Sequence, residues 1–322
     1  MKYVGSIDND AELILGTKKI LIYGTGRYGE RVYRNLMETG RNKDVVAFLE
    51  TSPGKGRLKS WGGGIPVIGL ESARELYENE IVCVSGKYVD EMKKSLAANG
   101  MNNIHHIDFL ADCERWGTAY GGFHVPLKCN NADSCIVYSF GIGEDLSFSQ
   151  EAIRKGAEVY AFDPTPRAIA YVKNSELSRH PRFHFYPIGL SDKNEKANFY
   201  LPVNPDYVSC SAVLHKAVDE RRPIEVEMKT LKVIMQEIGH KKIDILKMDI
   251  EGSEFDVIKN IVKVFGNFMP FTMLCMETHE RFFEDKTVLD ELYVMLQENG
   301  YYDRYGLVEE PTFVRCRCGD KI

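Results

Sequence analysis

One local pattern occurs twice in this chain: a short apolar run, a glycine-containing turn and an amphipathic helix. The first copy is KKILIYGTGRYGERVYRNLMETG, which ends at Gly40, and the second is DSCIVYSFGIGEDLSFSQEAIRKG, which ends at Gly156. Each copy is followed by another apolar run that ends in an acid, Glu50 in the first case and Asp163 in the second. Strands that alternate with helices form parallel sheets with helices on both faces. The sequence therefore predicts an α/β protein with two separate sheets.

The chain length agrees with two domains, because 322 residues exceed the roughly 100–200 residues that one domain commonly takes. The first series of strands and helices runs out near residue 110. We expect a Rossmann-like nucleotide-binding domain at 1–112, an irregular, glycine-bearing linker at 113–130 and a second Rossmann-like domain at 131–322. Two apolar runs on either side of Pro311 predict an antiparallel hairpin at the end of the second sheet.

Composition and charge argue against several classes of partner. The formal net charge is −6 and no long basic run occurs, so nucleic acid is a poor candidate. No apolar run reaches the roughly 18–20 residues of a membrane span, and the N-terminus lacks the features of a leader peptide. The eight cysteines include no Cys-x-x-Cys pair, which favours reduced thiols over a disulfide framework or a zinc site. We therefore expect a cytoplasmic protein; a homo-oligomer remains open.

The first glycine turn carries a complete G-x-G-x-x-G, formed by Gly24, Gly26 and Gly29 directly after an apolar run. In such turns the first two glycines allow a tight bend close to a ligand, and the third lets the helix pack on the strand. Glu50 follows at the distance where an acid binds a ribose hydroxyl. These residues predict a site for a nucleotide or nucleotide-sugar, with a purely structural role as the alternative. A nicotinamide-dependent sugar oxidoreductase and a non-catalytic nucleotide sensor also remain open.

The second turn differs, because Gly141 and Gly143 are followed at once by Glu144 and Asp145. Acids suit the start of a helix but repel a pyrophosphate that approaches the same amides. A cationic cofactor without phosphate fits better, and S-adenosylmethionine carries an ammonium and a sulfonium. Asp163, at the end of the next apolar run, is placed to accept both ribose hydroxyls.

Further polar residues follow the later strands. Ser191 and Asp192 end the string YPIGLSD, where they suit the edge of an adenine. Residues 201–223 contain three prolines and no clear period, and we expect a functional loop over the pocket or, as the alternative, a surface insertion.

Acids also follow the strand in IDILKMDIEGSEFDVI, where Asp249 and Glu251 come directly after the apolar run, and Glu277 and His279 follow the next one in LCMETHE. The carboxyl ends of parallel strands open into the ligand crevice. We predict that Asp249 accepts or orients a proton and that Glu251 binds acceptor hydroxyls or the cofactor's ammonium. His279 is a rival base, because its ordinary pKa near 6.5 leaves it largely neutral at pH 7. No metal is predicted, although these four side chains could hold a divalent cation as an alternative.

The second domain resembles the FkbM family of S-adenosylmethionine-dependent methyltransferases. The strings that carry the resemblance are VYSFGIGEDLSF, VYAFDPTP, IGLSDKNE and above all IDILKMDIEGSEFDVI. It covers about 131–322 and implies a methyltransferase-type sheet, S-adenosylmethionine as cofactor and methyl transfer to a hydroxyl of a sugar, glycan, lipid or polyketide. Ser139 stands where the family often has an acid, and we count it among the cofactor-binding residues.

The first domain resembles the nucleotide-binding N-terminal domains attached to some enzymes of sugar and surface-polysaccharide synthesis. The strings ILIYGTGRYGERVYRNL, VVAFLE and GIPVIGLESARE carry this likeness. It favours a sugar as the acceptor. The combined prediction is an S-adenosylmethionine-dependent O-methyltransferase that acts on a hydroxyl of a sugar, glycan or related small molecule.

Overall fold

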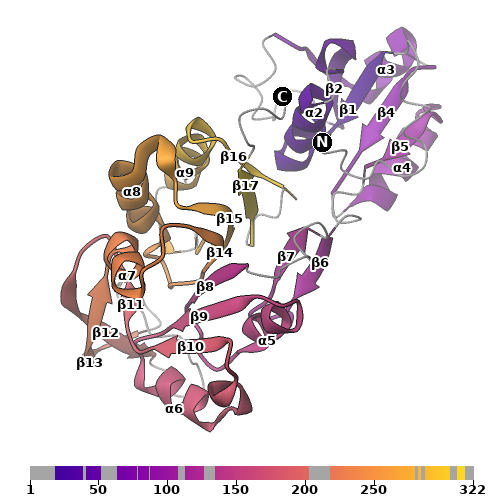
Figure 1. Ribbon diagram of the computed structural model, residues 1–322. Helices are drawn as coiled ribbons and strands as arrows, with labels where there is room; N and C mark the ends of the chain where they lie inside the picture. The colour runs from indigo at the N-terminus through magenta and orange to yellow at the C-terminus, as the bar shows by residue number, and fades with distance from the viewer. Residues whose placement is uncertain are drawn as a thin grey trace. The chain divides into compact units, whose positions relative to one another are not determined.

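The computed structural model describes most of the chain as two units. The described residues are 19–38, 41–51, 64–77, 79–86, 88–107, 113–126, 135–202, 218–279, 282–283, 287–304 and 310–315. One unit comprises Met1–Asp112 with Arg317–Ile322, and the other comprises Cys113–Cys316. Each contains its own parallel-rich sheet with helices beside it (Figure 1), so the predicted mixed α/β class is confirmed.

The described strands of the first unit form a five-stranded parallel sheet in the order β3-β2-β1-β4-β5. The strands are β1 (Ile20–Tyr23), β2 (Val45–Glu50), β3 (Val67–Gly69), β4 (Ile81–Val84) and β5 (Ile104–His106). The helices are α2 (Arg27–Glu38), α3 (Leu70–Tyr77) and α4 (Val89–Ala98). Both faces of the central strand β1 are buried, which explains why its sequence is apolar without alternation.

The described strands of the second unit form a seven-stranded sheet in the order β10-β9-β8-β14-β15-β17-β16. The strands are β8 (Ile136–Phe140), β9 (Glu158–Phe162), β10 (Phe183–Tyr186), β14 (Ile243–Met248), β15 (Phe271–Met276), β16 (Tyr301–Asp303) and β17 (Thr312–Arg315). The first five in this order run parallel, and β17 is antiparallel to both β15 and β16. The predicted C-terminal antiparallel hairpin is therefore present.

Alternate residues of the central strands pack on opposite faces of this sheet. Tyr138 and Leu246 belong to a core cluster with the helices α7 (Leu231–Ile238), α8 (Glu254–Phe265) and α9 (Thr287–Glu298). Val137 and Ile245 belong to a second cluster with α5 (Ser147–Arg154) and α6 (Pro166–Asn174) on the other face. Helices therefore pack on both faces of this sheet (Figure 1).

The segment 113–130 was predicted to be an irregular linker, and its described part instead has regular structure. Residues 113–126 form an antiparallel hairpin of β6 (Cys113–Trp116) and β7 (Phe123–Pro126). Trp116 is fully buried and its ring lies 5.8 Å from that of Phe148, so the hairpin is part of the second unit's core. Its strands are short and its turn is rich in glycine, which made the segment look irregular. Residues 127–130 lie outside the described residues.

A smaller sheet is added to the second unit. In the described part of the chain it contains β11 (Gly189–Leu190), β13 (Val218–Lys229) and β12 (Glu195–Pro202), in that order. Both ends of the loop predicted at 201–223 therefore lie in strands. Residues 203–217 lie outside the described residues, and a covering role for them stays a prediction.

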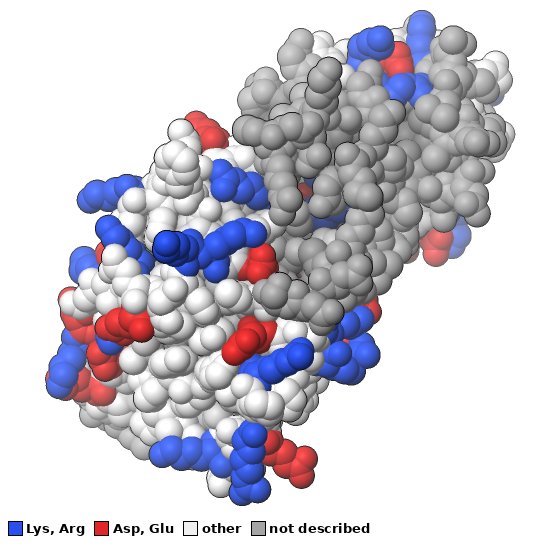
Figure 2. All heavy atoms as spheres, in the orientation of Figure 1, with Lys and Arg blue, Asp and Glu red and all other residues white. Residues whose placement is uncertain are grey.

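Charges of both signs are present on the face of the second unit that Figure 2 shows. Figure 2 shows Lys and Arg side chains interspersed with Asp and Glu side chains over the described surface of the second unit that faces the viewer. Among the helices that are described, none has both the length and the apolar character to cross a membrane.

Candidate active site

A pocket lies at the carboxyl ends of β8, β9 and β14 in the second unit. Its space is about 770 Å³ with the open mouth included. The residues that line it are Tyr120, Gly121, Phe140, Gly141, Ile142, Gly143, Asp145, Phe162, Asp163, Pro164, Thr165, Gly189, Leu190, Phe199, Met228, Lys247, Asp249, Ile250, Glu251 and Ser253. The predicted glycine turn and the acids after β9 and β14 are therefore brought to one place.

Asp163 holds the glycine turn in shape. Its Oδ2 accepts hydrogen bonds from the backbone N–H groups of Ile142 and Gly143, both at 2.9 Å. Its Oδ1 accepts from the N–H and the hydroxyl of Thr165, at 2.9 and 2.6 Å. The side chain is buried, with 5% exposed. The carboxylate thus occupies the turn amides that a phosphate would need.

The turn also lies directly against the end of β14. Gly141 has φ +76°, and a Cβ there would lie 1.7 Å from the backbone oxygen of Asp249. The buried Lys247 ties the same two segments together, because its Nζ donates to the Gly141 carbonyl at 2.6 Å and the Phe140 carbonyl at 3.2 Å, and lies 3.4 Å from Asp249 Oδ2. The position of Asp249 is therefore fixed by a glycine and a lysine.

Charge is uneven along the described lining of this pocket. The carboxylates are those of Asp145, Asp163, Asp249 and Glu251, and the ammonium of Lys247 is the single basic group among the residues given above. That ammonium is already bound to carbonyls and to Asp249. The pocket is therefore suited to a ligand with positive charge.

Apolar side chains form another part of the lining. They belong to Phe162, Pro164, Leu190, Phe199 and Met228, which come from the end of β9 and from the smaller sheet. A flat aromatic ring such as an adenine is the kind of group that such a wall binds.

Three residues predicted to bind cofactor are not among those that line the pocket. Ser139 is buried within β8, with 1% exposed. Ser191 continues the pairing of the smaller sheet, because its N–H donates to the Lys229 carbonyl at 2.9 Å. Asp192 lies next to it, and its carboxylate is 3.7 Å from the Lys193 ammonium. The predicted contact of Ser191 and Asp192 with an adenine edge therefore has no support in this geometry.

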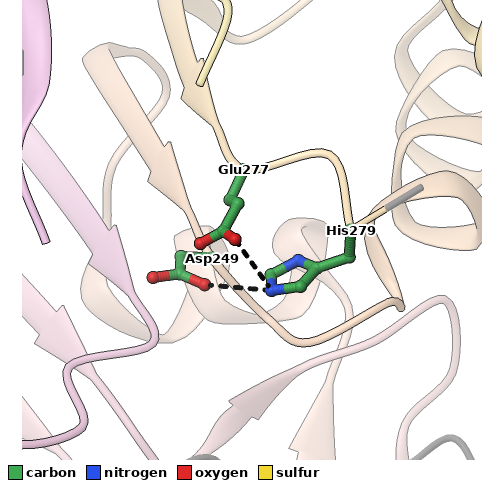
Figure 3. A group of neighbouring side chains, drawn as sticks. All are labelled: Asp249, Glu277 and His279. Carbon is green, nitrogen blue, oxygen red and sulfur yellow. Dashed lines mark ion pairs between the residues drawn. The ribbon is translucent and has the colours of Figure 1, made fainter. Parts of the chain in front are cut away.

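A group that we call the acid–imidazole cluster lies beside the pocket: Asp249, Glu251, Glu277 and His279. Figure 3 shows Asp249 and Glu277 directed at the Nε2 atom of His279. From that nitrogen, Glu251 Oε2 lies 3.3 Å away, Glu277 Oε1 3.5 Å and Asp249 Oδ1 3.7 Å. Three predicted catalytic residues are thus neighbours. The cluster shares Asp249 and Glu251 with the pocket lining.

Glu254, which the sequence analysis did not select, contacts the other ring nitrogen of His279. It is fully buried, and its Oε1 lies 2.8 Å from His279 Nδ1 and accepts from the Ile250 N–H at 2.9 Å. Its Oε2 accepts from the Gly252 N–H at 2.9 Å. Ile250 lies four residues before Glu254 in the chain. The hydrogen bond to Glu254 holds Ile250 in the turn that carries Asp249 and Glu251.

The surroundings of His279 change its charge. Burial lowers the pKa of His279, but the nearby carboxylates of Glu251, Glu254 and Glu277 raise it to about 11. These carboxylates favour the charged imidazolium over the neutral ring. The role of His279 as a neutral base stays a prediction.

The family assignment rests on the second unit. The family model Methyltransferase FkbM domain matches residues 134–302. The chain belongs to the FkbM methyltransferase family. The hairpin that brings Tyr120 and Gly121 to the pocket precedes the match.

Individual relatives of the FkbM domain agree with this. Over 141 residues the chain is 29% identical to the probable methyltransferase-like protein 24 of Homo sapiens, which covers 44% of this chain and 31% of that protein. It is 28% identical over 119 residues to the 2-O-methyltransferase NoeI of Sinorhizobium fredii (strain NBRC 101917 / NGR234), covering 33% of this chain and 48% of that protein. The matches span less than half the length of these relatives. A solved Methanococcus jannaschii fibrillarin, a pre-rRNA processing protein, aligns over 64% of this chain and 82% of that chain with a TM-score of 0.31 and 10% identity.

The first unit, which lies outside the FkbM match, also brings its predicted residues together. Gly24 has φ +103°, and a Cβ on Gly29 would lie 1.9 Å from the Gly24 backbone oxygen, so the helix packs closely on the turn. Glu50 accepts a hydrogen bond from the hydroxyl of Thr25 within the turn. A Cβ on Gly26 would meet nothing within 4 Å. The space above Gly26 is where a ligand could approach the backbone.

Proposed function

We propose that the second unit is an S-adenosylmethionine-dependent O-methyltransferase that acts on a hydroxyl of a sugar, glycan or related small molecule. The observation that carries the proposal is the turn after β8, whose amides are taken by Asp163 in a pocket where carboxylates outnumber basic groups. A phosphate is disfavoured there, and a cationic, phosphate-free cofactor is favoured. Membership of the FkbM methyltransferase family and a relative named as a 2-O-methyltransferase support the reaction type.

The lining suggests how such a cofactor lies. The apolar wall with Phe162, Leu190 and Met228 suits the adenine, and the lining acids other than Asp249 suit the sulfonium and ammonium. Asp163 supports the ribose region mainly through the turn that it holds. Tyr120, 67% exposed at the tip of the β6–β7 hairpin, borders the open side of the pocket.

Asp249 is the group that we assign to the reacting hydroxyl. In methyl transfer the bond from sulfur to methyl breaks, the bond from oxygen to methyl forms, and a neutral thioether leaves. The leaving group needs no acid, so the protein supplies in-line positioning, worth about 7–11 kcal/mol, and an acceptor for the hydroxyl proton. Lys247 and the Gly141 turn hold the carboxylate of Asp249 in one place for that purpose.

The test separates cofactor binding from turnover in the full chain. Asp249→Asn should bind S-adenosylmethionine with nearly unchanged affinity by calorimetry, but transfer of labelled methyl to a panel of sugars and glycans should fall by about 10²–10⁴-fold. Asp256→Asn, an exposed carboxylate on α8, is the matched control and should behave like the wild type. Full activity of Asp249→Asn would remove this residue from the reaction. Absence of S-adenosylmethionine binding in the wild type would refute the proposal itself.

For the first unit we propose a nucleotide or nucleotide-sugar ligand. The support is the open backbone at Gly26 beside Glu50 and Thr25. Calorimetry with NAD and with nucleotide-sugars tests it. Hydride transfer to NAD without methyl transfer would favour the oxidoreductase alternative, and nucleotide binding without either reaction would favour the sensor.

A further inference from the structure

The Nε2 atom of His279 is directed into a group of carboxylates from two strand ends. The side chain is buried, with 2% of the residue exposed, and this nitrogen has no hydrogen-bond partner among the described residues. Oxygens of Glu251, Glu277 and Asp249 lie 3.3, 3.5 and 3.7 Å from it. A buried nitrogen that faces several acids without bonding geometry to any of them points to a positive charge between them.

The spacing of these atoms is that of ligands around one ion. Charge-assisted hydrogen bonds between nitrogen and oxygen measure about 2.7–2.9 Å, shorter than the three distances here. Metal bonds of about 2.0–2.2 Å place two ligands about 3.0 Å apart at a right angle and about 3.5 Å apart at a tetrahedral angle. One ligand atom each from Asp249, Glu277 and His279 lies within 4.8 Å of the others (Figure 3).

The outer contacts of His279 also match those of a metal-bound imidazole. A ligating histidine usually donates its other N–H to a carboxylate, which fixes the ring and its tautomer. Here Nδ1 lies 2.8 Å from Glu254 Oε1, and that carboxylate is held by the N–H groups of Ile250 and Gly252. A cation among the carboxylates would replace the proton on Nε2, and the lone pair of this nitrogen would then be a ligand.

We propose that the acid–imidazole cluster binds one divalent cation. One imidazole nitrogen with several carboxylate oxygens suits a cation that accepts both ligand types, and Mn²⁺ is such an ion. Its charge offsets most of the negative charge that the carboxylates bring together. The binding site rests on this geometry alone.

The catalytic role of the cation rests on the proposed function. Asp249 and Glu251 belong to both the cluster and the pocket lining, so the ion lies at the end of the pocket assigned to the reacting hydroxyl. A cation there would bind the acceptor oxygen, favour loss of its proton to a carboxylate and orient it for in-line attack. The atoms transferred are those of the proposed reaction.

The test uses the full chain, freed of metal with a chelator and then titrated with Mn²⁺. Binding removes the electron paramagnetic resonance signal of free Mn²⁺, and we expect one ion per chain. Glu277→Gln and His279→Gln should each weaken binding by at least 10-fold, and Glu254→Gln, a positioning residue, by about 10–100-fold. Asp256→Asn, a change at an exposed acid, is the control and should leave binding unchanged. Circular dichroism verifies that each variant is folded.

Two outcomes would overturn the inference: no Mn²⁺ binding by the wild type, or stoichiometric binding that folded Glu277→Gln and His279→Gln both retain. In the first case a proton on Nε2 supplies the positive charge between the carboxylates instead. Calorimetry with S-adenosylmethionine on the chelated protein separates this inference from the proposed function. If the protein binds the cofactor but not Mn²⁺, the metal site is refuted and the proposed methyltransferase function stands. If it binds Mn²⁺ but not the cofactor, the proposed function is refuted and the metal site stands.

Discussion

The two glycine turns begin alike and end differently. In each, the first glycine donates its N–H to the carbonyl of the residue before an acid: Gly24 to Leu49 at 2.9 Å, and Gly141 to Phe162 at 3.0 Å. In the first unit the acid after that carbonyl, Glu50, accepts from the Thr25 hydroxyl. In the second unit the acid Asp163 accepts from two backbone amides of the turn itself.

This difference between the turns favours a different kind of ligand at each. An open turn leaves its N–H groups to an anion, whereas a turn whose amides are held by a buried carboxylate offers a phosphate no donors and a negative potential. The same local sequence pattern therefore predicts a strand–turn–helix in both places but not the same chemistry. The side chain of Asp163 is shorter than that of Glu50, which agrees with the close approach of its carboxylate to the backbone amides of the turn.

The largest expected effect comes from the tighter turn. In Gly141→Ala the new Cβ would collide with the backbone oxygen of Asp249 at a residue with φ +76°. We expect the free energy of unfolding of the second unit to fall by about 3–5 kcal/mol, measured by denaturant titration with the fluorescence of Trp116 as the signal. Wild-type stability of this variant would contradict the close contact between turn and strand.

The acids at the two turns give a matched pair. In Asp163→Asn the amide NH₂ group must face either the Ile142 and Gly143 amides or the donors of Thr165, so donors oppose donors whichever way it turns. We expect the affinity for S-adenosylhomocysteine to fall by about 100-fold or more, since unpaired buried donors cost about 1–3 kcal/mol each. Glu50→Gln, in the first unit, is the control, and calorimetry should find its affinity unchanged. Equal losses in both variants would mean that the two turns do not differ in this way.

A third comparison concerns two exposed tyrosines, Tyr120 beside the pocket and Tyr88 in the first unit, 67% and 69% exposed. In Tyr120→Ala the ring that borders the open side of the pocket is lost. Affinity for S-adenosylmethionine should fall by about 3–10-fold, the size of one aromatic contact. Tyr88→Ala should cause no change. An unaffected Tyr120→Ala would show that the hairpin tip only borders the site.

The smallest effect on stability is expected at Gly26. No atom lies within 4 Å of a Cβ built there, so Gly26→Ala should change the free energy of unfolding by less than about 1 kcal/mol. Binding of NAD or a nucleotide-sugar to the first unit should nevertheless be lost, because the methyl group occupies the place where a ligand approaches the backbone. Nucleotide binding that survives this change would place the ligand elsewhere.

The sequence predicted the elements whose signals are local. Apolar runs followed by glycine turns and amphipathic helices indicated the parallel strands, and the runs around Pro311 indicated the terminal hairpin. It missed the β6–β7 hairpin, because strands of four residues carry little periodicity and Trp116 is buried only by partners such as Phe148, far along the chain. Tertiary packing, which local patterns do not contain, decides such segments.

The site shows the same limit. Topology predicted that acids after successive strands gather at one sheet edge, and Asp163 and Asp249 do line one pocket. Topology did not predict which of these residues line the pocket: Ser191, whose backbone N–H donates to the Lys229 carbonyl, and Asp192 are not among the lining residues. The charge of His279 depends on Glu251, Glu254 and Glu277, which come from three separate positions in the chain.

The most direct measurement is a crystal structure of the full chain with S-adenosylhomocysteine. We predict its adenine against Phe162, Leu190 and Met228, and its sulfur on the side of Asp249, with the Asp163 hydrogen bonds to the turn amides intact. A cofactor bound at Gly24 and Gly26 instead, or a phosphate on the Ile142 and Gly143 amides, would contradict the account.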